Sequence, residues 1–250
     1  MIRHLSPRTV DPRDLDGEGE LPLPALAGAL ESVAAEHAAA LGCGMDRLLA
    51  RGLGWVMMRQ RLEALAPLFA GDALEIATWP SGVERLVVSR EFEVARAGEV
   101  VARASTAWLV LDLAARRPVR PAAVLDASLR ERLPALAPMA ERLPEPGPSA
   151  TAARLEVRPG DIDANAHVNN GAYLRWALDA TPPGVRRARR ASAVEAHYLA
   201  EAVLGDVVLV RSGAAGDGLA HETVREADGK VLARLATAWA PRQGASPLRP

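Results

Sequence analysis

Residues 98–108 read GEVVARASTAW, and residues 229–239 read GKVLARLATAW. At an offset of 131 residues, seven of these eleven positions are identical. Each stretch begins at a turn dipeptide, Ala97-Gly98 or Asp228-Gly229, and continues with the β-branched and small residues typical of a strand. The match therefore predicts that one strand, with the turn before it, occurs twice in the chain.

Two further pairs of segments match in the same order along the chain. Residues 70–74 read AGDAL and residues 204–208 read LGDVV, while residues 14–16 read DLD and residues 161–163 read DID. Chance similarity in a chain rich in alanine and valine is the alternative explanation. Three matches in one order favour an internal duplication. We expect an N-terminal half, a linker and a C-terminal half at residues 1–113, 114–150 and 151–241.

The two halves show the same order of predicted elements. Apolar residues spaced by three and four from Leu21 to Leu41 predict one long helix in the first half. The expected strands follow at 53–64, 72–80, 84–97 and 99–112. In the second half we expect a strand at 152–158, a helix at 170–180 that ends before Pro182-Pro183, and strands at 191–199, 206–213, 219–227 and 230–239. This pattern predicts an α+β fold in which each half places a long helix against a curved antiparallel sheet.

The connecting and terminal segments are less regular. Leucines between residues 125 and 143 of the linker predict a further helix, and the tail at 241–250 is expected to be disordered. The net charge of −1 gives no general attraction to nucleic acid or to membranes. No run of 18 apolar residues predicts a membrane span. One cysteine, Cys43, and no signal-like core in residues 1–16 lead us to expect a cytoplasmic protein.

A polar cluster stands immediately before the predicted second helix. Residues 161–170 read DIDANAHVNN, which places two carboxylates, three carboxamides and an imidazole within ten residues. Helix capping explains one or two aspartates or asparagines at such a position. It does not explain His167 or the cluster as a whole, so the segment is a candidate functional site.

The cluster, followed by Tyr173 and Trp176, resembles the acyl-ACP thioesterases of plants and bacteria. These are tandem, or double, hotdog enzymes within a wider group that includes thioesterases of 4-hydroxybenzoyl-CoA type. In the first half, residues 54–57 (GWVM) and 77–82 (ATWPSG) resemble the N-terminal hotdog of that family. The resemblance implies a hydrolase of fatty acid biosynthesis that releases free fatty acid and holo-ACP from acyl-ACP, without a cofactor or a metal.

The family's proposed catalytic residues can be carried over one by one. Its Asp, Asn and His match Asp163, Asn165 and His167, and the Glu of a second family segment matches Glu201. Ala202 stands where relatives have a cysteine, so a cysteine nucleophile at that position is excluded. Two routes remain open: water activated by Glu201 with His167, or direct attack by Asp163.

We expect the thioester oxygen to be bound by backbone N–H groups at the start of the second helix, around residues 168–171. Asn169, Asn170 and Gly171 are therefore candidate substrate-binding residues. Aligning residues 14–16 with 161–163 puts Glu18 opposite Asn165 and Glu20 opposite His167. This predicts one active site per chain, in the second half, while the first half binds the acyl tail. Trp55 is a candidate lining residue of that acyl-binding site.

The expected partner is acyl carrier protein, which is acidic, and Arg186 and Arg187 are candidate docking residues. A solvated surface is the alternative explanation for these arginines. Two other functions stay open: an acyl-CoA thioesterase that uses the same site, and a non-catalytic hotdog that binds acyl groups. The expected assembly is a monomer or a homodimer.

Overall fold

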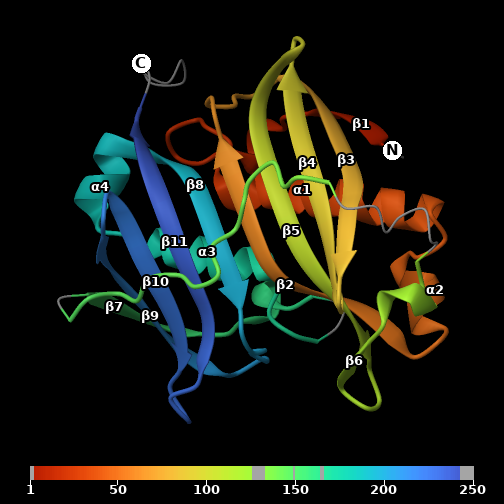
Figure 1. The fold of residues 1–250 in the computed structure, drawn as a ribbon. Helices are drawn as coiled ribbons and strands as arrows, with labels where there is room; N and C mark the ends of the chain where they lie inside the picture. The colour runs from red at the N-terminus through yellow and green to blue at the C-terminus, as the bar shows by residue number, and fades with distance from the viewer. Residues whose placement is uncertain (1–2, 126–132, 149, 164–165, 243–250) are drawn as a thin grey trace. The chain divides into compact units, whose positions relative to one another are not determined.

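The computed structural model describes residues 3–125, 133–148, 150–163 and 166–242, and its chain divides into two compact units (Figure 1). Unit 1 comprises Met1–Leu21 with Leu26–Pro138, and unit 2 comprises Pro22–Ala25 with Met139–Pro250. The division near residue 138 falls inside the segment that the sequence marks as a linker. No helix among the described residues is long and apolar enough to cross a membrane.

Unit 1 is built on an antiparallel sheet with the strand order β1-β3-β4-β5-β2, and β6 pairs with β5. Its strands are β1 (His4–Thr9), β2 (Leu53–Ala64), β3 (Ala73–Glu84), β4 (Val87–Arg96), β5 (Glu99–Asp112) and β6 (Arg117–Val119). Its helices are η1 (Pro12–Asp14), α1 (Leu23–Ala40, of which the part from Leu26 on belongs to unit 1), α2 (Met45–Leu49) and η2 (Pro121–Ala123). The apolar stripe of α1, from Leu26 through Leu30 to Val33, is buried, as the helical spacing predicts.

Unit 2 repeats this arrangement with the strand order β7-β9-β10-β11-β8, again antiparallel. Its strands are β7 (Thr151–Glu156), β8 (Arg189–Tyr198), β9 (Val207–Ala215), β10 (Gly218–Arg225) and β11 (Val231–Pro241). Its helices are η4 (Pro159–Asp161), α3 (Asn170–Asp179) and α4 (Pro183–Ala188). Helix α3 contacts β8, β9, β10 and β11 and buries Leu174, Trp176 and Ala177.

The two sheets therefore follow one plan, which the sequence repeat predicts. The equivalence extends to side chains. In β5 the indole Nε1 of Trp108 donates to Thr106 Oγ1 over 2.8 Å, and in β11 Trp239 Nε1 donates to Thr237 Oγ1 over 2.9 Å. The expected α+β fold, with a helix against an antiparallel sheet in each half, is confirmed.

Strand β1 and helix α4 are among the elements that were not predicted, with α2, β6 and the short 3-10 helices, and both contain proline. Strand β1 contains Pro7, which lacks a backbone N–H and is tolerated because β1 is an edge strand. Pro183 was expected only to end the preceding helix, yet it opens α4, where its missing N–H costs nothing.

The helix expected in the linker is wrong for the described part of that segment. Residues 133–143 contain no helix, and residues 133–137 instead bond to the sheet of unit 1 as a strap. The N–H of Leu133 donates to the Ser81 carbonyl over 2.7 Å, and the N–H of Leu136 donates to Glu91 Oε2 over 2.8 Å. Residues 126–132, and the tail at 243–250 that was expected to be disordered, lie outside the described residues.

Glu91 is the centre of this attachment. Its side chain is 1% exposed and also accepts hydrogen bonds from the hydroxyls of Ser81, over 2.7 Å, and Ser105. Ser105 Oγ in turn accepts the N–H of Ala137 over 3.0 Å. A leucine-rich segment thus follows a path set by buried polar groups, because each buried N–H requires an acceptor.

Candidate active site

The polar cluster forms a tight loop between η4 and α3 in unit 2. The N–H of Asp163 donates to the carbonyl of His167 over 2.9 Å, and the N–H of Ala166 donates to the carbonyl of Asp163 over 3.1 Å. Ala166 adopts a φ of 63°, which is uncommon for a residue with a Cβ atom. Residues at such sparsely populated angles gather at functional sites. Asn165, a predicted catalytic residue, lies outside the described residues.

The two aspartates of the loop have different surroundings. Asp161 is 8% exposed; its carboxylate accepts the N–H of Arg158 over 2.9 Å and pairs with Arg175. The carbonyl of Asp161 also accepts the N–H of Asn169 over 2.8 Å. Asp161 therefore holds the loop to α3, whereas Asp163 is half-buried beside the site.

The structure brings His167 and Glu201 together from segments 34 residues apart in the sequence. His167 Nε2 lies 3.4 Å from Glu201 Oε2, and the two side chains are 34% and 40% exposed. The N–H of Val168 donates to the carbonyl of Ala202 over 2.9 Å, which joins the two segments next to this contact. Ala202 is fully buried and serves as packing and as a backbone acceptor.

The start of α3 offers fewer backbone donors than expected. Within residues 168–171, the N–H of Val168 bonds to Ala202 and that of Asn169 to Asp161. The N–H of Gly171 donates over 2.7 Å to the side-chain oxygen of Asn169, which caps the helix. Of these four groups, the N–H of Asn170 alone has no acceptor in the described part of the chain. The candidate oxyanion donor is thereby narrowed to Asn170.

Aromatic side chains pack at the N-terminal end of α3. The rings of Tyr173 and Tyr198 meet edge to face at 5.8 Å, and the hydroxyl of Tyr198 donates to the carbonyl of Asn170 over 3.3 Å. Burial raises the pKa of Tyr173 to about 12, so its phenol stays neutral. Sequence reasoning assigned no role to Tyr198, although it is the last residue of β8 and precedes Glu201 by three residues.

Unit 1 contains the equivalent backbone turn without the histidine and the asparagine of the cluster. The N–H of Asp16 donates to the carbonyl of Glu20 over 2.8 Å, and the N–H of Gly19 donates to the carbonyl of Asp16 over 3.0 Å. Gly19, which aligns with Ala166, has a φ of 78°. The backbone frame is therefore shared, with Glu18 and Glu20 at the positions of Asn165 and His167.

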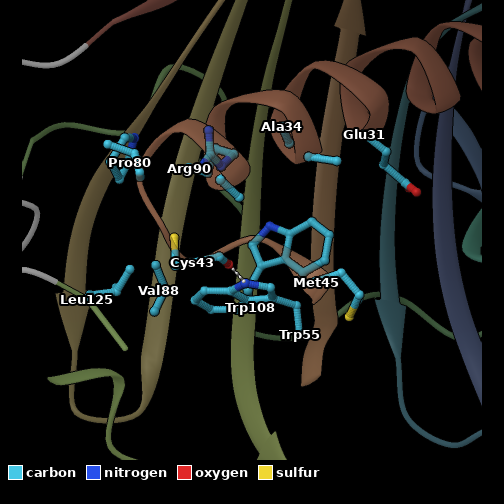
Figure 2. Close-up of a pocket in the computed structure, with 13 residues that line it drawn as sticks. Glu31, Ala34, Cys43, Met45, Trp55, Pro80, Val88, Arg90, Trp108 and Leu125 are labelled. Carbon is cyan, nitrogen blue, oxygen red and sulfur yellow. Dashed lines mark hydrogen bonds between the residues drawn. The ribbon is translucent and has the colours of Figure 1, made fainter. Parts of the chain in front are cut away.

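Unit 1 instead contains an apolar cavity of about 130 Å³ between α1 and the sheet (Figure 2). Trp55 lies on its wall, as predicted, together with Trp108 and Ala34. The indole Nε1 of Trp55 donates to the carbonyl of Cys43 over 2.9 Å. Because both indole N–H groups are bonded within the protein, the two rings present fixed apolar faces to the cavity.

One cation, Arg90, also lines this cavity. Its Nη1 lies 3.1 Å from Thr78 Oγ1 and 3.1 Å from His37 Nδ1. Burial lowers the pKa of Arg90 to about 10, so the guanidinium remains charged near neutral pH. Burial, followed by the charge of Arg90, lowers the pKa of His37 to about 4, which keeps that imidazole neutral and able to accept.

The predicted docking arginines lie on the last turn of α4. Arg186 and Arg187 are exposed, whereas Arg190, in the same run, is 8% exposed and belongs to the interior. His167 precedes the start of α3, and α4 follows its end. Helix α3 has ten residues and is therefore about 15 Å long, so this length of helix lies between His167 and the arginines of α4 along the chain.

Comparison with known proteins identifies the family of the chain. The family model for the acyl-ACP thioesterase N-terminal domain matches residues 8–127, and the model for the C-terminal domain matches residues 145–241. A chloroplastic acyl-[acyl-carrier-protein] hydrolase of Cuphea viscosissima is 25% identical over 236 residues, which cover 85% of this chain and 57% of that protein. A chloroplastic oleoyl-acyl carrier protein thioesterase of Arabidopsis thaliana is 25% identical over 73% of this chain and 56% of its own length. The chain thus spans little more than half the length of these curated relatives.

Solved structures share the fold. An acyl-ACP thioesterase from Bacteroides thetaiotaomicron superposes with a TM-score of 0.85 at 23% identity, covering 95% of this chain and 98% of that one. The 12:0-ACP thioesterase from Umbellularia californica gives a TM-score of 0.83 at 18% identity, covering 96% and 98%. These likenesses identify the fold as a tandem hotdog. Because the two family models together match most of the sequence, the chain belongs to the acyl-ACP thioesterase family.

Proposed function

We propose that the protein hydrolyses fatty acyl-ACP to free fatty acid and holo-ACP, with Asp163, Asn165, His167 and Glu201 as the reactive groups. The observation that carries this proposal is the 3.4 Å contact between His167 and Glu201 beside the start of α3. Membership of the family supports the choice of substrate. The place of the reaction in fatty acid biosynthesis follows from the product.

In the proposed reaction, Glu201 and His167 transfer protons, and the start of α3 stabilises the oxyanion. Glu201 and His167 take the proton from a water molecule as it attacks the thioester carbonyl, and the imidazole returns a proton to the leaving thiolate. The N–H of Asn170 and the positive end of the α3 dipole stabilise the developing oxyanion. In the alternative route the Asp163 carboxylate attacks the thioester carbonyl, the C–S bond breaks to release the protonated thiol, and water attacks the Asp163 carbonyl of the resulting mixed anhydride to give the fatty acid and free Asp163. Incorporation of labelled solvent oxygen into Asp163 during a single turnover distinguishes the two.

We further propose that residues 1–113 accommodate the acyl tail and that residues 151–241 carry the chemistry, joined by the linker at 114–150. The apolar cavity of unit 1 supports this division, since an alkyl chain gains about 0.8 kcal/mol for each buried CH₂ group. The proposed compartment is the cytoplasm, which the single buried thiol of Cys43 supports. The proposed assembly is a monomer or a homodimer.

The test is a hydrolysis panel on the full chain. Acyl-ACPs of increasing chain length and the matching acyl-CoAs are supplied, and release of free thiol is followed. We expect kcat/KM to be higher for the ACP esters. Equal or faster hydrolysis of the CoA esters would favour the acyl-CoA thioesterase, and binding without thiol release would leave a non-catalytic acyl-binding protein.

Narrowing the cavity should change the preferred chain length. Ala34 of α1 lines the cavity, so Ala34→Phe fills part of it and excludes the end of a long chain. We expect kcat/KM on the longest accepted acyl-ACP to fall about tenfold relative to the shortest. Ala40→Phe, at the exposed end of the same helix, is the control and should leave the profile unchanged. An unaltered profile in Ala34→Phe would show that the tail binds elsewhere.

Removing the exposed charges of α4 should weaken carrier recognition. We expect the double variant Arg186→Ala/Arg187→Ala to raise KM for acyl-ACP about fivefold at low salt while kcat is preserved, since rim charges act mainly on association. The effect should shrink as ionic strength rises. Arg117→Ala/Arg120→Ala removes the same charge from unit 1 and serves as the matched control. Identical kinetics for wild type and the α4 variant would exclude docking at this helix.

A further inference from the structure

Arg225, the last residue of β10, binds the segment that carries Glu201. Its Nη2 donates to the carbonyl oxygen of Glu201 over 2.8 Å. Its Nε lies 3.5 Å from Asp206 Oδ2 and its Nη1 lies 3.6 Å from Asp228 Oδ2. The arginine side chain is only 24% exposed. A guanidinium fixed by two carboxylates thus holds the main chain of Glu201 through a charge-assisted hydrogen bond.

The segment 199–206 depends on such bonds because, apart from the buried Ala202, its apolar side chains contribute little packing. Leu199, Val203 and Leu204 are 55%, 44% and 59% exposed. The backbone is anchored where the N–H of Leu199 donates to the carbonyl of Leu232 over 2.8 Å and where the N–H of Val203 donates to Asp206 Oδ2 over 3.0 Å. Glu201 lies between these anchors and next to the buried Ala202, so hydrogen bonds set its place together with that one core contact.

We call this arrangement, an arginine that contacts both a main-chain carbonyl and a nearby aspartate, a clamp. Unit 1 contains the same clamp, but the residue whose carbonyl it holds there has no carboxylate side chain. Arg96 Nη1 donates to the carbonyl of Pro67 over 3.1 Å and to Asp72 Oδ2 over 2.7 Å. Asp72 Oδ2 also accepts the N–H of Phe69 over 2.9 Å, as Asp206 does for its own segment. Pro67 and Asp72 precede Glu201 and Asp206 by the same 134 positions. The clamp therefore belongs to the repeated fold. Of the two held residues, Glu201 contacts a histidine, whereas its counterpart Pro67 has no side-chain group that could do so.

We propose that Arg225 is a positioning residue that keeps the Glu201 carboxylate against His167, and that its counterpart Arg96 has only a structural role. This inference rests on the hydrolysis proposed above. A displacement of about 1 Å in a reacting group can cost on the order of 100-fold in rate. Loss of the clamp therefore affects the chemical step more than substrate binding.

The experiment compares Arg225→Met with Arg96→Met in the full chain. Each variant breaks one copy of the same clamp, so we expect similar falls in melting temperature. For acyl-ACP hydrolysis, Arg225→Met should lower kcat about 10- to 100-fold with KM within about twofold, whereas Arg96→Met should keep the wild-type kcat. Arg225→Lys retains a charged donor and should recover most of the rate. Adding Arg225→Met to Glu201→Gln should lower kcat by less than about twofold, because the group to be positioned is already lost.

Hydrogen exchange supplies a readout that does not need activity. Amides of residues 199–206 should exchange faster in Arg225→Met than in wild type or in Arg96→Met. If Arg225→Met does not fold, Asp206→Asn and Asp72→Asn loosen the same two clamps and repeat the comparison. Equal loss of kcat in the two arginine variants, or unchanged exchange at 199–206, would overturn the positioning role. Absence of thiol release by the wild type, with faster exchange in Arg225→Met, would instead refute the proposed reaction and leave the clamp in place.

Discussion

His167→Ala should lower kcat for acyl-ACP hydrolysis by about 10²- to 10⁴-fold, which is the usual contribution of a positioned general acid–base group. In the proposed reaction the imidazole, 3.4 Å from Glu201, is the group that carries the proton. Since the loop is held by Asp161 and by the backbone bond between Asp163 and His167, the substitution should leave the fold intact. KM should change little, because the apolar tail rather than the imidazole provides most of the binding energy.

The matched control for this variant is His4→Ala, which removes a partly exposed histidine of unit 1. It should retain the wild-type kcat. Glu201→Gln should resemble His167→Ala, and the double variant should be scarcely slower than either single variant, since residues that act as one unit are not additive. Full activity in His167→Ala would refute the assignment of the site.

Glu91→Ala should lower the free energy of unfolding by about 3 kcal/mol. The buried carboxylate accepts hydrogen bonds from Ser81, Ser105 and the N–H of Leu136, and its removal leaves these donors without their acceptor at about 1–3 kcal/mol for each that stays unpaired. For a chain of this length, the melting temperature should fall by roughly 5–10 °C. Urea denaturation gives the free energy directly if the slope of the transition is unchanged.

Glu93 provides the control for this second variant. It lies two residues further along β4 on the same face and is half-buried, so Glu93→Ala should change stability by less than about 0.5 kcal/mol. Glu91→Gln keeps one oxygen acceptor and should lose less than Glu91→Ala. Equal stability of Glu91→Ala and Glu93→Ala would mean that the linker strap is held by other contacts.

The sequence predicted those features that depend on pattern. The repeat at 98–108 and 229–239 predicted two sheets of the same order, because strands that share turns and alternation share their pairing. The cluster around His167 predicted a candidate site, because capping chemistry could not account for an imidazole, and the structure places His167 beside Glu201. The alignment of Glu20 with His167 also agrees with the structure, in which both carbonyls accept the equivalent backbone bond.

Features that depend on distant partners could not be predicted. Nothing near Arg225 in the sequence indicates that its guanidinium reaches Glu201, because that contact exists only after β10 and the segment at 199–206 are folded together. The linker was wrongly predicted as a helix where it is described, since its leucine spacing is helical while its backbone is bonded to buried groups of the sheet. Asn170 could be singled out as the candidate oxyanion donor only once the structure showed which acceptors the N–H groups of Val168, Asn169 and Gly171 bind.

The duplicated loop, with Glu18 and Glu20 in one copy and His167 in the other, has an evolutionary consequence. In a symmetric homodimer of single repeats, every substitution that adapts the tail cavity would appear in the catalytic copy as well. Linking the copies in one chain removes that constraint. The cavity beside Trp55 and Trp108, which we propose as the tail site, can then diverge to suit new acyl chains while the proposed reactive groups stay under separate selection.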